Sequence, residues 1–237
     1  MNRNAFIGRN VEILFKNSVG DNPSVLAKIQ EYFGIKSRYL NSMSTGMQNE
    51  KGDVKMEFAG GENIDANIKA FKQSSVSYNQ LTRTGITNFC KLFFNEDMQR
   101  ELEGLFVAKA RNKHAHAFTE AIAEAIGTKA KEILSWAFSY KESREILVIY
   151  ERDTSTMNIY AMRDVFKTLG KEVGFTRNGN IQIGKSVVIQ RKGGNGVHAE
   201  PIPKDSLRHP GNNVQIKLKM KEFINEMESI LLATYRI

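Results

Sequence analysis

Between Val54 and Lys72 apolar and polar residues alternate almost without interruption, apart from the tripeptide Ala59-Gly60-Gly61. Successive side chains of a β-strand point to opposite faces of the sheet, so this pattern is typical of strands with one buried face. A glycine-rich break between two such runs predicts a β-hairpin. On the returning strand Asn67 and Lys69 are two residues apart and are expected on one face, with Ile68 packing into the core behind them.

Helical and strand-like periodicities are interspersed along the rest of the chain. Apolar residues recur at helical spacing, and these segments are 5–19, 23–33, 95–106, 118–126, 129–138, 165–169 and 222–232. Short β-branched or alternating runs predict strands, at 146–150, 157–161, 181–183, 187–191 and 214–220. Because there is no clean βαβ alternation, the sequence predicts an α/β or α+β fold, with a central mixed β-sheet flanked by helices in one domain over 1–237.

The charge of the 237-residue chain favours a polyanionic partner, since 34 basic and 26 acidic residues give a net charge of +8. The segment 185–221 alone carries eight basic and two acidic residues. The alternative is a solvated basic face kept for solubility. No run reaches the roughly 18 apolar residues of a membrane span, and the first residues lack the apolar stretch of a signal peptide. We therefore expect a cytoplasmic protein with no membrane partner.

The predicted hairpin contains the groups that a divalent-metal phosphodiesterase needs. Asp53 offers a hard carboxylate oxygen at the start of the first strand. The Asn67 side-chain oxygen and the Ile68 carbonyl could complete a magnesium site, with the Lys69 ammonium beside an attacking water. The alternative is that these residues form only an exposed polar strand face.

Three other motifs are better explained as structural features than as catalytic or ligand-binding sites. Residues 179–186 match the G-x-x-x-x-G-K-[ST] phosphate-loop pattern, but they alternate as a strand, and the β-branched residues that follow do not open a helix. His114 and His116 lack a nearby third ligand, which makes a weak zinc site, and a polar loop is favoured. Cys90 lies in an apolar stretch and is expected to be a buried, inert thiol.

Several segments of the chain resemble one nuclease family. The segment 180–196, with its core Ile-Gln-Arg-Lys-Gly-Gly, and the later segment 213–217 are similar to the DNA-reading strand and loop of MspI-like monomeric type II restriction endonucleases. These enzymes belong to the PD-(D/E)xK nuclease superfamily. Asp53 with Asn67-Ile68-Lys69 matches their variant catalytic pattern Asp … Asn-x-Lys, and Asn79-Gln80 matches a pair that meets DNA. The sequence departs from the superfamily pattern at Gly52, where relatives carry proline, and at the neutral Asn67.

The resemblance implies a restriction-endonuclease-like fold, with 1–95 forming mainly a catalytic lobe and 96–237 mainly a DNA-recognition lobe. It implies Mg²⁺-dependent cleavage of double-stranded DNA at a short, four-base-pair palindrome with a central CG step, leaving 5′-phosphate ends. Asp53, Asn67 and Lys69 would be catalytic. Glu12 on the first helix is a further candidate, and Glu57, which shares a strand face with Asp53, is its alternative. A prokaryotic cytoplasmic protein acting as a monomer is expected, with dimerisation through the last helix left open.

The implied DNA contacts fall into two groups. Base contacts are expected from the pair Asn79 and Gln80, from the run Gln190, Arg191, Lys192, Gly193, Gly194 and Asn195, and from Gln215 and Lys217. Phosphate contacts are expected from Lys204, Arg208, Lys219 and Lys221. A non-catalytic DNA-binding or repair accessory protein is the alternative function, and nothing between 95 and 175 matches the family residue by residue.

Overall fold

The structure is a computed structural model that describes residues 3–45, 53–72, 78–140, 144–194 and 201–237. The chain forms two compact units. Unit 1 combines Met1–Asn79, Tyr140–Leu169 and Ile224–Ile237, and unit 2 combines Gln80–Ser139 and Gly170–Phe223. No helix within the described ranges is long and apolar enough to cross a membrane.

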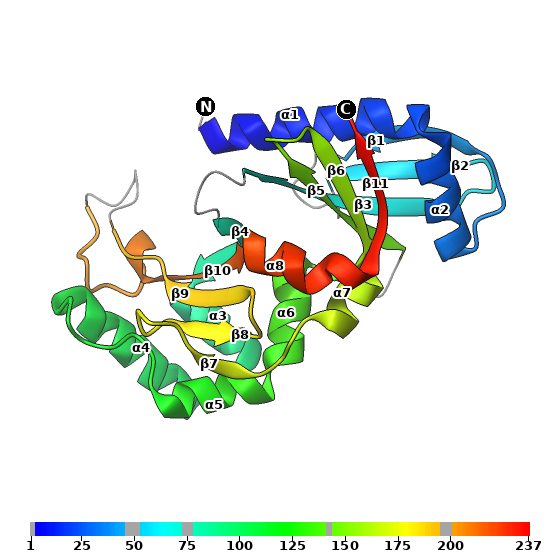
Figure 1. Cartoon of the computed structure of the whole chain (residues 1–237). Helices are drawn as coiled ribbons and strands as arrows, with labels where there is room; N and C mark the ends of the chain where they lie inside the picture. Colours follow the sequence, from blue (N-terminus) through cyan, green and yellow to red (C-terminus); the bar gives the residue numbers. More distant parts are fainter. Residues whose placement is uncertain (1–2, 46–52, 73–77, 141–143, 195–200) are drawn as a thin grey trace. The chain divides into compact units, whose positions relative to one another are not determined.

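Unit 1 is built on a six-stranded sheet in the order β1-β2-β3-β5-β6-β11 (Figure 1). The strands are β1 (Tyr39–Ser44), β2 (Val54–Phe58), β3 (Asn63–Phe71), β5 (Glu145–Glu151), β6 (Thr156–Ala161) and β11 (Leu231–Arg236). β3 and β5 run parallel, whereas every other neighbouring pair is antiparallel. The sheet is therefore mixed, as the sequence predicts.

One face of this sheet packs against two helices, α1 (Arg3–Ser18) and α2 (Pro23–Phe33), which lie along it in Figure 1. Phe15 and Ile29 from the helices meet Met56 and Ile64 from the strands, and all four are completely buried. The opposite face of β2 and β3 carries the polar residues of the alternation. Hydrophobic burial therefore orients the hairpin and places its polar residues on the face opposite this core.

Unit 2 contains a five-stranded sheet in the order β4-β10-β9-β8-β7. Its strands are β4 (Tyr78–Gly85), β7 (Val173–Phe175), β8 (Ile181–Ile183), β9 (Val187–Arg191) and β10 (Asn213–Lys219). The helices of the same unit are α3 (Ile86–Phe93), α4 (Glu96–Arg111), α5 (Glu120–Thr128) and α6 (Ala130–Phe138). α3 contacts β10 and α5 contacts β7, so helices pack against both a central and an edge strand of this sheet.

The local signals that predicted these elements are visible in the structure. The Asn95 side chain accepts a hydrogen bond of 2.9 Å from the Met98 N–H and begins α4. The Gly61 N–H donates to the Phe58 carbonyl at 3.0 Å, which closes the turn of the predicted hairpin. Gly184 has φ +55°, and an added Cβ would lie 2.7 Å from the Gly170 carbonyl oxygen, so this turn requires glycine.

The prediction of a helix over 222–232 is wrong in its second half. α8 (Met220–Met227) ends earlier, and after a short 3₁₀ turn the chain continues as β11, which pairs antiparallel with β6. Ala233 and Tyr235 of β11 are buried while Thr234 between them is exposed, a period-two pattern. Pairing with the edge of the sheet overrides the weak helical periodicity of this segment.

The structure also differs from the sequence prediction in two larger respects. A second sheet accompanies the predicted central one. The compact units do not divide the chain at residue 95, because α7 (Met162–Thr168), β5, β6 and the C-terminal strand lie in unit 1 with the N-terminal segment. Long-range strand pairing, such as β3 with β5, brings distant segments into one unit.

Candidate nuclease site and nucleic-acid interface

The β2–β3 hairpin places the predicted catalytic side chains as the alternation requires. Ile68 is 7% exposed and belongs to the hydrophobic core, whereas Asn67 and Lys69 on either side of it are half-buried on the opposite face. β5 supports this strand from the other side, with Asn67 opposite Leu147 and Lys69 opposite Ile149. The candidate site therefore lies on a strand that is hydrogen-bonded to a neighbouring strand on each edge.

Asp53 lies directly before β2, and its backbone and side chain both form hydrogen bonds to β3. Its backbone N–H donates to the Ala66 carbonyl at 2.8 Å, and its Oδ2 accepts from the Ile68 N–H at 2.6 Å. Ala66 and Ile68 are two residues apart, so their backbone polar groups face the same neighbour. The Asp53 carboxylate therefore lies at the edge to which Ile68 directs its N–H and carbonyl, and its second oxygen remains available.

Glu12 is electrostatically linked to the same residues. The pKa of the Glu12 carboxyl is raised by partial burial and then by the negative charge of Asp53, while the positive charges of Lys69 and Arg9 act in the opposite direction. Residues on α1 and on the hairpin therefore share one electrostatic environment. The sequence had identified Glu12 only by its position on the first helix.

Glu57 lies at the other end of β2. It pairs with Asn63 and is four residues from Asp53, about 13 Å along an extended strand. This separation exceeds the reach of a shared ion. Of the two alternatives, Glu12 is the one brought near Asp53 and Lys69.

The set of oxygen donors suits a hard cation. Among the described residues no group of three His, Cys, Asp or Glu side chains could hold a metal ion, in keeping with the neutral Asn67. The Asn67 Nδ2 is buried and makes no hydrogen bond within those residues, so the protein alone leaves this amide incompletely satisfied. The carboxylates of Glu12 and Asp53, the Asn67 amide and the Ile68 carbonyl offer oxygen atoms, which Mg²⁺ prefers.

A carboxylate that the sequence interpretation did not use lies on the same strand face. Asp65 precedes Asn67 by two residues and is therefore directed to the same side, and its neighbour across the parallel ladder is the buried Glu145. The alternation that placed Asn67 and Lys69 also placed Asp65. Only the register between β3 and β5 could reveal Glu145 beside it.

In unit 2, three glutamines from neighbouring strands form a hydrogen-bonded row, here called the amide row. Gln190 of β9 donates through Nε2 to the Gln215 Oε1 of β10 at 3.2 Å, and Gln215 Nε2 in turn donates to the Gln80 Oε1 of β4. Gln190 and Gln215 are direct partners in the antiparallel register. The structure thus joins residues from all three segments that the sequence assigned to DNA contact.

The amide row lies on the face of the sheet opposite its apolar core. Val214, Ile216 and Leu218 alternate with Gln215, Lys217 and Lys219 along β10, and the three apolar residues are at most 1% exposed. Partial burial lowers the pKa of Lys217. Lys219 Nζ donates to the Gln182 Oε1 of β8 at 2.6 Å and thereby extends the polar surface to a fourth strand.

Arg191 does not join this surface. It follows Gln190 directly and pairs with Val214, so its side chain leaves the strand on the opposite face. Its Nε donates to the Asn212 Oδ1 at 2.8 Å, and partial burial lowers its pKa. The alternation of side chains along a strand predicts that Gln190 and Arg191 lie on opposite faces, because adjacent strand residues cannot share a face.

The remaining predicted contacts lie at the end of β9 and on β4. The Lys192 N–H donates to the Asn213 carbonyl at 2.9 Å, and Gly193 and Gly194 have φ of +66° and +63°. An added Cβ at either glycine would meet nothing within 4 Å. Asn195 lies outside the described residues. Asn79 donates to the Ala70 carbonyl at 2.8 Å and belongs to unit 1.

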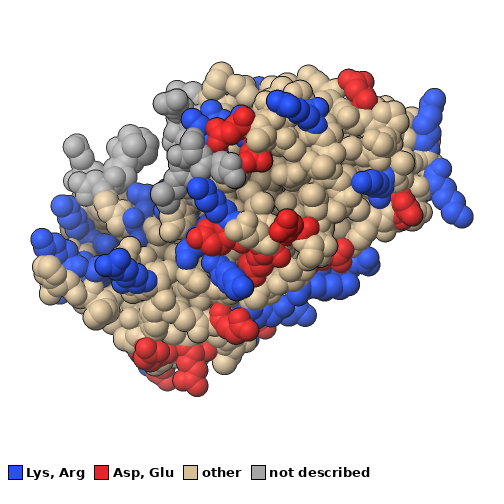
Figure 2. All heavy atoms as spheres, viewed as in Figure 1, with Lys and Arg blue, Asp and Glu red and all other residues tan. Residues whose placement is uncertain are grey.

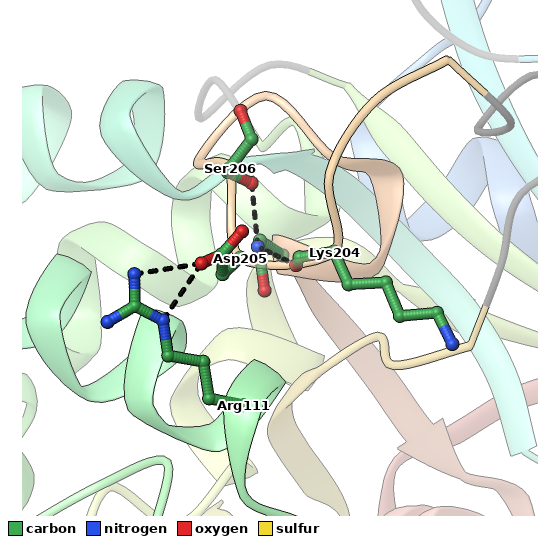
Figure 3. A network of polar contacts seen from close by, with 5 residues as sticks. Arg111, Lys204, Asp205 and Ser206 are labelled. Carbon is green, nitrogen blue, oxygen red and sulfur yellow. Dashed lines mark hydrogen bonds and ion pairs between the residues drawn. The ribbon is translucent and has the colours of Figure 1, made fainter.

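The loop that precedes β10 is fastened at two places (Figure 3). Arg111 at the end of α4 binds Asp205 through Nε and a second nitrogen, both at 2.8 Å. The fully buried Asn212 donates to the carbonyls of Lys204 and Ser206 at 3.0 and 2.7 Å. The side chain of Lys204 extends away from this network and is exposed. Figure 2 shows Lys and Arg side chains gathered at the left of the view, over this loop and α4.

The motifs set aside in the sequence have the expected structures. The phosphate-loop match forms β8, a turn and β9 rather than a loop before a helix. His114 and His116 are exposed in the loop between α4 and α5. Cys90 is completely buried, and burial raises the pKa of its thiol to about 12.

Fold and site together define a mixed α+β protein, with a strand-mounted cluster of oxygen donors in one unit and a basic, amide-bearing sheet in the other. No protein-family model matches the sequence, and no curated protein matches it either. A solved structure of the restriction endonuclease MspI in complex with its cognate DNA is similar over 82% of this chain and 77% of that chain. The TM-score is 0.49 and the sequence identity is 11%.

Proposed function

We propose that this protein is a type II restriction endonuclease that hydrolyses double-stranded DNA at a short specific sequence with Mg²⁺ as cofactor. The observation that carries the proposal is the electrostatic association of Glu12 with both Asp53 and Lys69, together with the hydrogen bond by which the Asp53 carboxylate accepts from the Ile68 N–H. A merely polar strand face does not require a helix glutamate to share burial and charge with the strand aspartate.

Asp53, the Asn67 side-chain oxygen and the Ile68 carbonyl would hold the ion, with Glu12 assisting from α1. Bound there, Mg²⁺ supplies Lewis acidity, which polarises a phosphodiester and makes a water more acidic. The proximity of two carboxylates and the oxygen atoms of the Asn67 amide and the Ile68 carbonyl are the features that fit such an ion, whereas the Asn67 Nδ2, unpaired among the described residues, is a donor and would face an acceptor rather than the cation. Asn67 in place of an acid leaves the site with less negative charge than a two-carboxylate strand would have.

Lys69 would act directly on the reacting groups. Its ammonium has three N–H donors, which orient the attacking water and stabilise negative charge on the phosphate. The backbone hydrogen bond from Ile68 to Asp53 fixes the carboxylate before DNA binds, so little reorganisation remains at the reaction step. Attack by water with release of the 3′ oxygen would leave a 5′-phosphate and a 3′-hydroxyl.

The amide row would read base edges. A glutamine side chain both donates and accepts, and the mutual hydrogen bonds of Gln190, Gln215 and Gln80 fix which edge of each amide is presented. Lys192 and Lys217 would add donors suited to guanine in the major groove. A four-base-pair palindrome with a central CG step, read by one prokaryotic cytoplasmic chain, is the proposed target.

A plasmid digest tests the proposal most directly. Supercoiled plasmids of known sequence are incubated with purified protein in Mg²⁺ or in excess chelator, and the ends of the fragments are sequenced. Discrete fragments with 5′-phosphate ends, formed only with Mg²⁺, are the expected result. Plasmid that is retarded in a gel but never cut would instead favour the non-catalytic DNA-binding alternative.

A pair of lysine variants tests whether cleavage depends on Lys69. Lys69→Met is expected to lower the cleavage rate by about 100- to 1,000-fold, the usual cost of removing one preorganised donor. Lys55→Met removes the same charge from the neighbouring strand, where Lys55 pairs with Asp65, and is expected to cut at nearly the normal rate. Equal rates for the two variants would contradict the role assigned to Lys69.

A further inference from the structure

A cavity of about 530 Å³ in unit 2 lies away from the amide row and has no part in the proposed cleavage. It is open to solvent and is bordered by the end of α4, the loop after it, the turn between β7 and β8, and the end of β9. The volume is in the range of small-molecule sites and far exceeds that of a single ion. Its occupant is therefore to be sought among ligands of nucleotide size.

The residues that line the cavity give it a strongly positive character. Lys109, Arg177 and Arg191 contribute permanent positive charges, and His114 and His116 contribute imidazoles. No Asp or Glu is among the described lining residues. The nearby acid Asp205 forms its ion pair with Arg111, which lies outside the lining, so it does not neutralise these charges.

Arg191 is held in advance for binding an anion. Asn212 uses both hydrogens of its amide on backbone carbonyls, which fixes its Oδ1 to accept from the Arg191 Nε. The guanidinium retains four N–H donors on its two terminal nitrogens, in the planar arrangement that matches phosphate oxygens. Because the side chain is already ordered, little conformational entropy remains to be lost on binding.

The opposite wall offers polar groups suited to the rest of a nucleotide. Thr176 accepts from the Asn180 N–H at 3.1 Å and its carbonyl accepts from the Gly179 N–H at 2.9 Å, so the β7–β8 turn is well defined. Gly179 has φ +70°, and the His116 ring lies against it, 3.8 Å from the position of an added Cβ. Asn178 and Asn180 supply amides that can both donate to and accept from a base or sugar.

We propose that this cavity binds a phosphorylated ligand of nucleotide size, with its phosphate held by Arg191, Arg177 and Lys109. The ligand is a free nucleotide or the phosphorylated end of a nucleic acid, which share the same phosphate monoester. This site is separate from the hairpin, and its occupation requires neither DNA cleavage nor a divalent cation.

Calorimetric titration of the full chain in chelator tests the site, with 2′-deoxycytidine 5′-monophosphate as probe. The same nucleoside without phosphate, inorganic pyrophosphate and a 5′-phosphorylated duplex are titrated for comparison. We expect the nucleotide to bind and the nucleoside not to bind. Binding of the duplex end with the same sensitivity to the variants below identifies a nucleic-acid end as a source of the phosphate, whereas binding of the nucleotide without the duplex end identifies a free nucleotide.

Arg177→Ala is expected to weaken nucleotide binding at least tenfold, because a charge-assisted hydrogen bond to phosphate is lost. Lys131→Ala, which removes a lysine of α6 outside the cavity, is the matched control and should bind normally. Absence of nucleotide binding, equal binding of the nucleoside, or identical affinities for the two variants would overturn the proposal. These titrations contain no cleavage step, so they fail or succeed independently of the nuclease assignment.

Discussion

The hydrogen bond between the Ile68 N–H and the Asp53 carboxylate allows the structural and catalytic contributions of Asp53 to be separated. In Asp53→Ala the Ile68 N–H loses its acceptor, which costs about 1–3 kcal/mol if no water replaces it. In Asp53→Asn an oxygen remains to accept, and the loss is limited to the charge-assisted part, about 1 kcal/mol. Both variants also remove the negative charge that raises the pKa of Glu12, so this contribution cancels between them.

We therefore expect the order of stability wild type, Asp53→Asn, Asp53→Ala, with the two variants about 1–2 kcal/mol apart. For a chain of this size each kcal/mol corresponds to roughly 2–4 °C in Tm. Thermal unfolding followed by circular dichroism in chelator measures the stabilities, and plasmid digestion in Mg²⁺ measures cleavage, which both variants should lose. An Asp53→Ala protein with the Tm of Asp53→Asn would refute the structural role, and cutting by either variant would refute the catalytic one.

Three further predictions concern the helix glutamate, the β8–β9 turn and the basic surface. Glu12→Gln should slow cleavage about 10- to 100-fold, as expected for a group that supports a metal site, whereas Glu57→Gln should cut normally; equal rates in a digest time course would exclude the assistance from α1. Gly184→Ala should lower the free energy of unfolding by about 2 kcal/mol or more in urea, because it combines positive φ with a backbone clash, and an unchanged midpoint would argue against this turn. Lys221→Ala should weaken binding to target and random DNA alike and reduce the salt slope by about one, whereas a loss confined to the target would contradict a phosphate contact.

The hairpin and its polar face could be predicted because their signal lies in neighbouring residues. Apolar and polar residues alternate on both sides of the Ala59-Gly60-Gly61 turn, and the alternation places Asn67 and Lys69 together. The same reasoning separates Gln190 from Arg191, a distinction that grouping them in one motif concealed. Local periodicity thus determines the face of a side chain wherever the strand itself is recognised.

Strands with weak periodicity escaped the sequence patterns. β1 and β4 are largely polar or exposed along their length, and the apolar residues of β11 continue a spacing that predicts the end of a helix. Each is stabilised by pairing with a neighbouring strand: β1 with the next strand, β2, and β4 and β11 with the more distant β10 and β6. Their conformation follows from backbone hydrogen bonds to that neighbour more than from their own residues.

The amino-acid order alone thus determined the mixed fold class, the polar face of the hairpin and the residues offered there as ligands. Tertiary packing decided that Glu12, rather than Glu57, approaches Asp53, and it brought Gln80 within hydrogen-bonding distance of Gln215, 135 residues away. Turns and strand alternation depend on steric and hydrogen-bonding preferences within a few residues. Contacts across such separations depend on how whole elements bury their apolar faces, which no local pattern specifies.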